Sequence, residues 1–240
     1  MKKLAKNIVA VVLGYQVRKL CKKNNLKVVA VTGSIGKTST KLAAAKVLSA
    51  GFKVQSQDGN YNDLVSVPLV FFGEKMPSLY NPLAWLAVFW RNQKQLAKPY
   101  AYDIVVVELG SDRPGDIRQF GKYLRVEIAI VTAIAPEHMQ NFTSLDDVAA
   151  EELAVKDYAS LVMANQDLCA DKYLKTVPQL LTYGLRKPAD YGPLIIKGAK
   201  AKSEAEQYSL MAAAAVAEKL GIKAADIQKS LAGVKAAPGR

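Results

Sequence analysis

The chain has 240 residues, and 50% of them are hydrophobic, a composition typical of a globular protein and not of a disordered one. This length is sufficient for one large α/β domain or for two small ones. The net charge of +12 favours an acidic partner: a nucleotide, a phosphorylated substrate, a nucleic acid or an anionic membrane. Because no RNA- or DNA-binding motif accompanies the basic residues, we expect no nucleic-acid partner.

The cysteines and the N-terminal segment bear on the cellular compartment. Cys21 and Cys169 lie far apart and lack the spacing of metal ligands, so two free thiols fit a reducing cytoplasm. Lysines followed by the apolar residues 8–13 resemble a signal peptide, but the run is short and basic residues follow it. No stretch is long enough to span a bilayer. We therefore expect a cytoplasmic protein.

Residues 1–25 are predicted to form a separate N-terminal element, an amphipathic basic helix over residues 3–23. We expect one apolar face, made of Leu4, Ile8, Val11, Val12 and Tyr15. This face either packs on the core or lies against a membrane surface, which would make the chain a peripheral membrane protein. Lysines and arginines crowd the same segment: Lys2, Lys3, Lys6, Arg18, Lys19, Lys22 and Lys23.

The next stretch has the order strand, glycine-rich turn and helix. Residues 28–31 are apolar and mostly β-branched, which predicts a buried strand, and residues 41–48 have helical spacing. Such an order is the context of a phosphate-binding loop, in which glycines admit the phosphates and the helix N–H groups favour an anion. The spacing G-x-x-G-K-T-S departs from the common G-x-x-x-x-G-K-[ST]. This departure leaves an ordinary glycine-rich turn as an alternative, although a nucleotide site is favoured. The predicted nucleotide contacts are Gly33, Ser34, Gly36, Lys37, Thr38 and Ser39.

Apolar runs alternate with helical patterns through the rest of the chain. Strands are predicted at residues 52–55, 104–109, 127–132, 161–164 and 179–183, and helices within 77–99, 145–159, 205–220 and 224–231. The helix within 77–99 has an aromatic face, with Trp85 and Trp90, and a basic end, which suits either the core or a docking surface. The alternation predicts an α/β fold, a mostly parallel sheet with helices on both faces.

Ligands in open α/β sheets bind beyond the carboxyl ends of the strands. Three predicted strand ends carry reactive groups there: Lys37 and Thr38, then Glu108, then His138, the single histidine of the chain. Each of Glu108 and His138 alone suits a surface position, but with the loop they fit a Mg²⁺–nucleotide site. Histidine is an unusual Mg²⁺ ligand, so tolerance of Mn²⁺ or a second metal is a corollary.

An ordered set of motifs resembles the Mur ligase family over residues 26–240, as its central ATP-binding domain. The motifs are T-G-S-I-G-K-T-S-T (32–40), G-N-Y-N-D (59–63) with V-P (67–68), V-E-L-G…P-G-D-I (107–117), A-P-E-H-M…F-T-S-L (135–145) and P-G-R (238–240). The resemblance implies an ATP-dependent amide-bond ligase of peptidoglycan precursor synthesis. In this family a substrate carboxylate attacks the γ-phosphate of ATP, and an amine then displaces phosphate from the resulting acyl phosphate.

The resemblance also implies roles for individual residues. Lys37 would neutralise the transferring phosphoryl group, while Thr38 and Glu108 would hold a first Mg²⁺ and His138 a second. Two residues of the G-N-Y-N-D loop would face the muramyl-peptide precursor, and the last residue of the chain would approach the ATP phosphates. These are Asn60, Asn62 and Arg240.

Two positions depart from the family pattern. The carbamylated lysine that many members use as a metal ligand falls on Glu152, which could supply a carboxylate directly, with Lys156 as the alternative. The H-N-x-x-N adenine motif is replaced by Ala205, Glu206 and Ser209, so adenine recognition is altered. Asn165 is a weak candidate to help bind the adenine.

The family's N-terminal uridine-nucleotide domain and C-terminal domain, which helps bind the amine substrate, are not recognisable. We therefore expect a fragment that is inactive alone, and whether its precursor is UDP- or lipid-linked stays open. One alternative is a related ligase on another carboxylate, of the folylpolyglutamate or glutamate-polymer type. The other is a non-catalytic nucleotide-binding scaffold.

Overall fold

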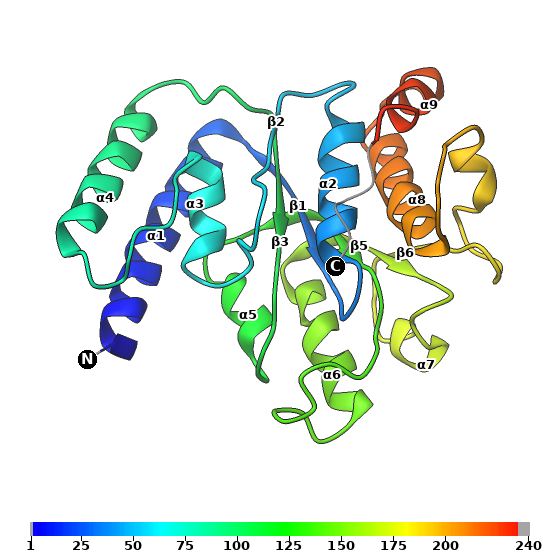
Figure 1. The fold of residues 1–240 in the computed structure, drawn as a ribbon, viewed down its shortest axis with the longest axis horizontal. Helices are drawn as coiled ribbons and strands as arrows, with labels where there is room; N and C mark the ends of the chain where they lie inside the picture. The colour runs from blue at the N-terminus through cyan, green and yellow to red at the C-terminus, as the bar shows by residue number, and fades with distance from the viewer. Residues whose placement is uncertain (1, 235–240) are drawn as a thin grey trace.

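The computed structural model describes residues 2–234, and its centre is a sheet of six strands (Figure 1). Every pair of neighbouring strands is parallel, in the order β2-β3-β1-β4-β5-β6. The predicted α/β fold with a mostly parallel sheet is therefore confirmed. The strands are β1 (Lys27–Thr32), β2 (Val54–Gln55), β3 (Ile104–Glu108), β4 (Val126–Val131), β5 (Ala159–Asn165) and β6 (Leu180–Tyr183).

Helices cover both faces of this sheet, as predicted (Figure 1). One layer consists of α2 (Lys37–Leu48), α8 (Glu204–Lys219) and α9 (Ala224–Leu231). The other layer includes α1, α3, α5 and α6, and α4 packs against α1 at its outer end. The elements not yet given bounds are α1 (Lys2–Asn24), α3 (Ser66–Phe72), α4 (Pro82–Ala97), α5 (Asp116–Phe120), α6 (Leu145–Glu152), η1 (Leu153–Asp157), α7 (Asp171–Leu174) and η2 (Pro193–Ile196).

The central strands are apolar on both sides because both sides are covered. In β1, Val28 and Ala30 belong to the core on one face, while Val29 and Val31 belong to the core on the other. All four side chains are essentially inaccessible to solvent. A parallel strand between two helical layers needs a continuous apolar run and not an alternating one.

The alanine-rich helix α8 packs closely on α2. Its residues 208–217 are all buried, and four consecutive alanines occupy positions 212–215. Small side chains let the two helix backbones approach, so α2, which contacts β1 and β3, and α8, which contacts β5 and β6, form one continuous layer. A hydrogen bond of 3.2 Å between the hydroxyls of Thr40 and Ser209 also joins the two helices.

The first helix buries a different face from the predicted one. Ile8, Val11 and Tyr15 are exposed, and the side chain of Leu4 lies outside the described part of the chain. The buried stripe consists instead of Val9, Leu13, Val17 and Leu20. The helix has two apolar stripes, and α3 and α4 cover only this second one.

Several local elements also differ from the predicted ones. The predicted helix 145–159 is α6 followed by the 3₁₀ turn η1, and Ala159 already begins β5. The short elements α3, α5, α7 and η2 were not predicted. All seven residues of α3 are buried, so its sequence has no amphipathic period to detect. No helix between residues 2 and 234 has the length and apolar character needed to cross a membrane.

Overpacking the α2–α8 contact should destabilise the protein. Replacing the fully buried Ala213 by leucine should lower the free energy of unfolding by about 1–3 kcal/mol, because extra methyl groups enter a closely packed layer. Urea unfolding followed by circular dichroism measures this change. Ala225→Leu, at an exposed position of α9, is the matched control, and an equal loss in both variants would contradict the packing described here.

Candidate functional site

The carboxyl ends of β3, β1 and β4 are neighbours in the sheet, and a cleft of about 760 Å³ lies beyond them. Most of the predicted site residues line this one cleft, although they come from distant parts of the sequence. They are Ser34, Gly36, Lys37, Thr38, Ser39, Asn60, Asn62, Glu108 and His138. Gly33, Glu152 and Asn165 do not line it, and Arg240 lies outside the described residues.

The glycine loop between β1 and α2 is held tightly against the end of β4. Gly33 has φ +116°, and a Cβ there would lie 2.5 Å from the Thr132 hydroxyl and 2.9 Å from the Ala133 nitrogen. The Ser34 backbone N–H donates to the Ala133 carbonyl at 2.9 Å. Only glycine fits this position, since a side chain would meet both a forbidden dihedral and the neighbouring backbone.

The helix that follows the loop begins without a cap. Gly36 occupies the N-cap position with φ +85°, no side chain accepts from the first N–H groups, and no acid stands in the first turn. By contrast, Asn81, Ser144 and Ser203 cap α4, α6 and α8 with their side chains. The uncapped end of α2 borders the cleft, which is the arrangement that favours a bound anion.

Lys37 lies at the base of the loop with its ammonium group partly shielded. Its Nζ donates to the Gly33 carbonyl at 2.6 Å and to the Ser34 carbonyl at 3.3 Å, and it lies 3.3 Å from a carboxylate oxygen of Glu137. Sequence reasoning missed Glu137, although it stands beside His138 in the A-P-E-H motif. Backbone carbonyls and one carboxylate thus hold the lysine next to the uncapped helix end.

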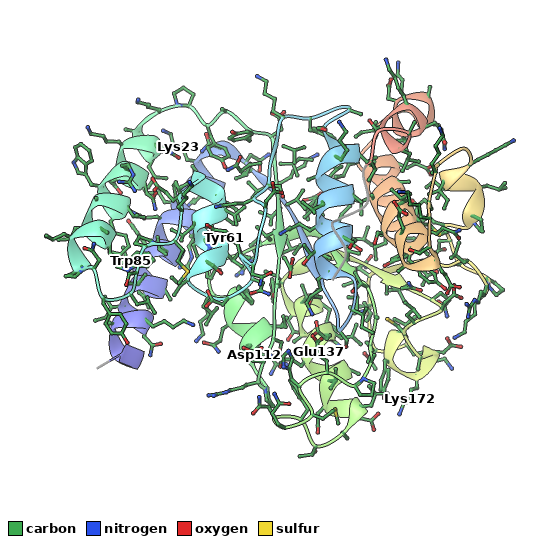
Figure 2. The ribbon with its side chains drawn as sticks, viewed as in Figure 1. Lys23, Tyr61, Trp85, Asp112, Glu137 and Lys172 are labelled. Carbon is green, nitrogen blue, oxygen red and sulfur yellow. The ribbon has the colours of Figure 1, made fainter. Side chains whose placement is uncertain are left out.

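His138 is flanked by two carboxylates on the cleft wall. Its Nε2 lies 3.5 Å from Asp112 Oδ1 and 3.5 Å from Glu137 Oε1. Figure 2 shows Asp112 and Glu137 near each other, on the segments that follow β3 and β4. His138 has φ +51°, a left-handed conformation uncommon for a residue with a side chain. Asp112 was not among the predicted site residues.

Glu108 is the buried centre of the cleft floor, with 3% of its surface exposed. The Thr38 hydroxyl donates to its Oε2 at 2.9 Å, and the Asn62 amide donates to its Oε1 at 3.4 Å. The ammonium group of the equally buried Lys41 lies 3.5 Å from Oε2 and donates to the Gly59 carbonyl at 3.1 Å. Lys41 was not predicted, although it directly follows the G-K-T-S-T motif.

Glu152 lies beneath the glycine loop. Its Oε2 accepts from the Gly33 N–H at 2.7 Å and from the Thr32 hydroxyl. Burial raises the pKa of the Glu152 carboxyl, and these hydrogen bonds with the charge of Lys37 offset that rise only in part. Lys156, the alternative, points elsewhere and donates to Thr176 at 3.0 Å. Metal binding by Glu152 stays a prediction.

The oxygen atoms of Thr38 and Glu108 suit a hard cation such as Mg²⁺. Within residues 2–234, however, no three histidine, cysteine, aspartate or glutamate side chains lie close enough together to hold a metal ion. The side chains present therefore provide a hydroxyl and one carboxylate at the loop, and a phosphate group would have to complete such a site. Such a ligand set is typical of Mg²⁺, which proteins usually bind through one or two carboxylates together with substrate phosphates.

The neighbouring Glu151 has a different task from Glu152. Its carboxylate accepts from the backbone N–H groups of Gly115 and Ile117, both at 2.6 Å, and from the Ser111 hydroxyl at 3.1 Å. It thereby holds the segment after β3, which carries Asp112 into the cleft wall. The family pattern pointed to Glu152 alone, and no sequence signal indicated the role of Glu151.

The residues at the expected adenine motif are used for helix capping. The Ser203 hydroxyl accepts from the Glu206 N–H at 3.2 Å and so caps α8, and Glu206 accepts from the Lys202 N–H at 2.6 Å, one residue before the N-cap. Ala205 and Ser203 line the cleft. The N-terminus of α8 therefore borders the site but is closed by its own side chains.

Asn165 is fully buried at the end of β5, where it shapes a turn. Its Oδ1 accepts from the N–H groups of Asp167 and Leu168 at 3.0 and 3.2 Å. Asp167 in turn accepts from the backbone N–H groups of Leu185, Arg186 and Lys187 and from the Tyr208 hydroxyl. A direct contact between Asn165 and adenine stays a prediction.

Removing Lys41 should leave Glu108 as a buried charge without its cation. We expect Lys41→Met to lower the free energy of unfolding by about 3 kcal/mol, because an uncompensated buried carboxylate is costly. Adding Glu108→Gln to this variant should restore part of the loss. Urea unfolding of the single and double variants measures both effects. The control is Lys46→Met at an exposed position of α2, and a loss equal to that of Lys41→Met would refute the pairing.

Asp167 should make stability depend on pH in the acid range. Desolvation opposes ionisation, but the N–H groups of Lys187, Arg186 and Leu185 outweigh it and lower the pKa of Asp167. A carboxylate whose pKa is lowered by folding stabilises the fold at pH values above its pKa in the unfolded chain. This stabilisation is lost as the pH falls through its pKa in the folded protein. Asp167→Asn should therefore reduce stability at pH 7 and have progressively less effect below about pH 4. Thermal unfolding between pH 7 and pH 3, with the exposed Asp58→Asn as control, tests this; a pH-independent difference would exclude it.

Comparison with known proteins supports one family. Residues 31–234 match the model of the Mur ligase middle domain. The UDP-N-acetylmuramoyl-tripeptide--D-alanyl-D-alanine ligase of Bacillus subtilis (strain 168) is 26% identical over 170 residues, which cover 69% of this chain and 31% of that relative. The motifs found in the sequence also resemble this type of ligase.

Solved structures of two relatives have the same fold as this chain. The structure of MurF from Acinetobacter baumannii has a TM-score of 0.76 at 21% identity and covers 98% of this chain and 51% of its own. MurF ligase from Thermotoga maritima in complex with ADP has a TM-score of 0.70 at 21% identity, covering 96% of this chain and 53% of its own. The chain thus spans about half the length of these structures and less than a third of the B. subtilis relative. With the family model matched across most of its length, the chain belongs to the Mur ligase family through its middle domain.

Proposed function

We propose that this chain is the ATP-binding central domain of an ATP-dependent carbon–nitrogen ligase of peptidoglycan precursor synthesis. The observation that carries the proposal is the single cleft in which Lys37, the uncapped end of α2 and the Thr38–Glu108 pair meet. An ADP complex is known for the Thermotoga maritima relative, and the B. subtilis relative is named for joining a muramoyl tripeptide to D-alanyl-D-alanine.

The loop residues would bind the phosphates of ATP. The N–H groups at the start of α2 point a partial positive charge towards the cleft, and Lys37 adds a full charge beside them. To reach a phosphate, Lys37 would exchange its bonds to the loop carbonyls for charge-assisted ones, which are stronger. Ser34, Gly36 and Ser39 line the same wall and would complete the cradle.

Thr38 and Glu108 would hold Mg²⁺, with Mn²⁺ as an alternative. When bound, the cation would neutralise charge on the phosphates and on a reacting acyl group. His138, on the cleft wall between Asp112 and Glu137, is proposed to serve a second metal position. Lys41 would pair with Glu108 and hold it in place without touching the nucleotide.

Asn60 and Asn62 would bind the precursor whose carboxylate is activated. Both line the cleft, and Asn62 is fixed there because its carbonyl accepts from the Gly110 N–H at 2.8 Å. We propose that the amine substrate needs a further C-terminal domain and that the 240-residue chain alone is inactive. A cytoplasmic location would suit both the substrates and the free thiols of Cys21 and Cys169. Contact with a membrane stays a separate proposal.

Calorimetric titration with a non-hydrolysable ATP analogue tests the nucleotide site. We expect binding that requires Mg²⁺ and that weakens by about 10- to 100-fold in Lys37→Ala, since a charge-assisted contact is lost. Lys46→Ala, a change of the same type on the exposed side of α2, should bind as the unmodified chain does. His138→Ala should weaken binding less than Lys37→Ala, because Lys37 stands at the uncapped start of α2 and His138 does not.

The outcomes separate the alternatives. Failure of both this chain and a longer protein that contains it to bind the analogue would favour a non-catalytic scaffold. Turnover of a pteroyl or glutamyl substrate in place of a muramyl peptide by the longer protein would favour a ligase for another carboxylate.

A further inference from the structure

The exposed apolar side chains of this protein gather at one end of the molecule. Of the fifteen large hydrophobic residues that are exposed in the described part of the chain, nine lie in residues 2–24 and 75–98. These segments form α1, the turn before α4, and α4, which pack together at the end farthest from α8 and α9 (Figure 1). We call this set the α1–α4 surface: Ile8, Val11, Tyr15, Met76, Leu79, Tyr80, Leu83, Leu86 and Trp90.

On α4 the exposed residues form one stripe. Leu83, Leu86 and Trp90 follow each other at helical spacing and are 75%, 61% and 60% exposed. The opposite side of the helix carries Trp85 and Val88, which are buried against α1 and α3. The fold therefore uses one apolar side of α4 and leaves a second apolar side facing solvent.

The exposed side of α1 is apolar in its first half and basic in its second. Ile8, Val11 and Tyr15 continue along the same helical stripe into Lys19 and Lys22, which are also exposed. None of the three apolar residues is needed for the core, which α1 contacts through Val9, Leu13 and Val17.

The charge around this surface has a single sign. Residues 2–24 and 75–98 contain eleven lysines and arginines and no aspartate or glutamate, so they account for eleven of the twelve net positive charges. Two nearby carboxylates are already paired: Glu74 with Arg91 at 2.6 Å and Asp63 with Lys6 at 2.9 Å. The Lys94 ammonium lies over the Trp90 ring, 3.4 Å from its centroid, so cation and aromatic ring share one position.

We propose that the α1–α4 surface docks on an anionic phospholipid bilayer, with α4 lying in the plane of the interface. Leucines would enter the acyl boundary, Tyr and Trp rings suit the headgroup level, and lysines attract anionic headgroups. A second copy of the chain would present the same positive charge and is disfavoured as the occupant. The inference does not depend on the proposed ligase activity.

Vesicle co-sedimentation of the 240-residue chain tests the docking. We expect binding to phosphatidylcholine vesicles that contain phosphatidylglycerol, weak binding to pure phosphatidylcholine, and loss of binding as the salt concentration rises. The variant Leu83→Ser/Leu86→Ser/Trp90→Ser should partition about tenfold less or worse, because its interfacial apolar row is gone. Its nucleotide affinity and circular dichroism should be unchanged, since all three side chains are exposed.

Two further variants sharpen the test. Leu194→Ser removes an equally exposed leucine from η2, beside α8 at the other side of the sheet, and should leave vesicle binding unaltered. Trp90 is the exposed one of the two tryptophans, so its emission should shift to the blue on anionic vesicles. Trp90→Phe should still bind, but without this shift, because Trp85 is buried in the protein.

Three results would overturn the proposal. The first is the absence of binding to anionic vesicles, and the second is binding that the triple variant retains in full. The third is a concentration-dependent dimer that light scattering detects in the unmodified chain and not in the triple variant, which would assign the surface to a second copy.

Discussion

The site depends on one buried carboxylate, Glu108, at the end of β3. A carboxylate removed from water is costly unless charges and hydrogen bonds replace the lost hydration. Here Thr38 and Lys41 from α2 and Asn62 from the loop before α3 supply that replacement. Because all three must reach the same two oxygen atoms, the glycine loop after β1, the predicted substrate loop and the sheet are held in one fixed relation.

The acidic residues around the loop divide between building the cleft and lining it. Glu151 and Glu152 are adjacent in the sequence, yet one holds the backbone after β3 and the other the backbone after β1. Glu137 instead reaches the cleft and contacts both Lys37 and His138. Glu152 and the end of β4 contact the glycine loop and thereby fix its backbone conformation.

The cleft and the α1–α4 surface are separate, but they share the first helix. Lys6 near the start of α1 lines the cleft and pairs with Asp63 of the predicted substrate loop. A few residues later the same helix exposes Ile8 and Val11. A bilayer docked on α1 would therefore lie close to the loop of Asn60 and Asn62.

The amino-acid sequence alone determined the parallel α/β fold, the strand–loop–helix unit at residues 28–48, and the strand ends that carry Glu108 and His138. These depend on short-range patterns, apolar runs and glycine spacing, which a single sequence displays directly. Only the tertiary structure decided which apolar stripe of α1 is buried, since both stripes have the same periodicity and α3 and α4 cover just one. It also decided that Lys41 pairs with Glu108, and that Glu151 and Glu152 hold different loops. Such roles come from contacts between segments far apart in the chain, and no local pattern of residues records them.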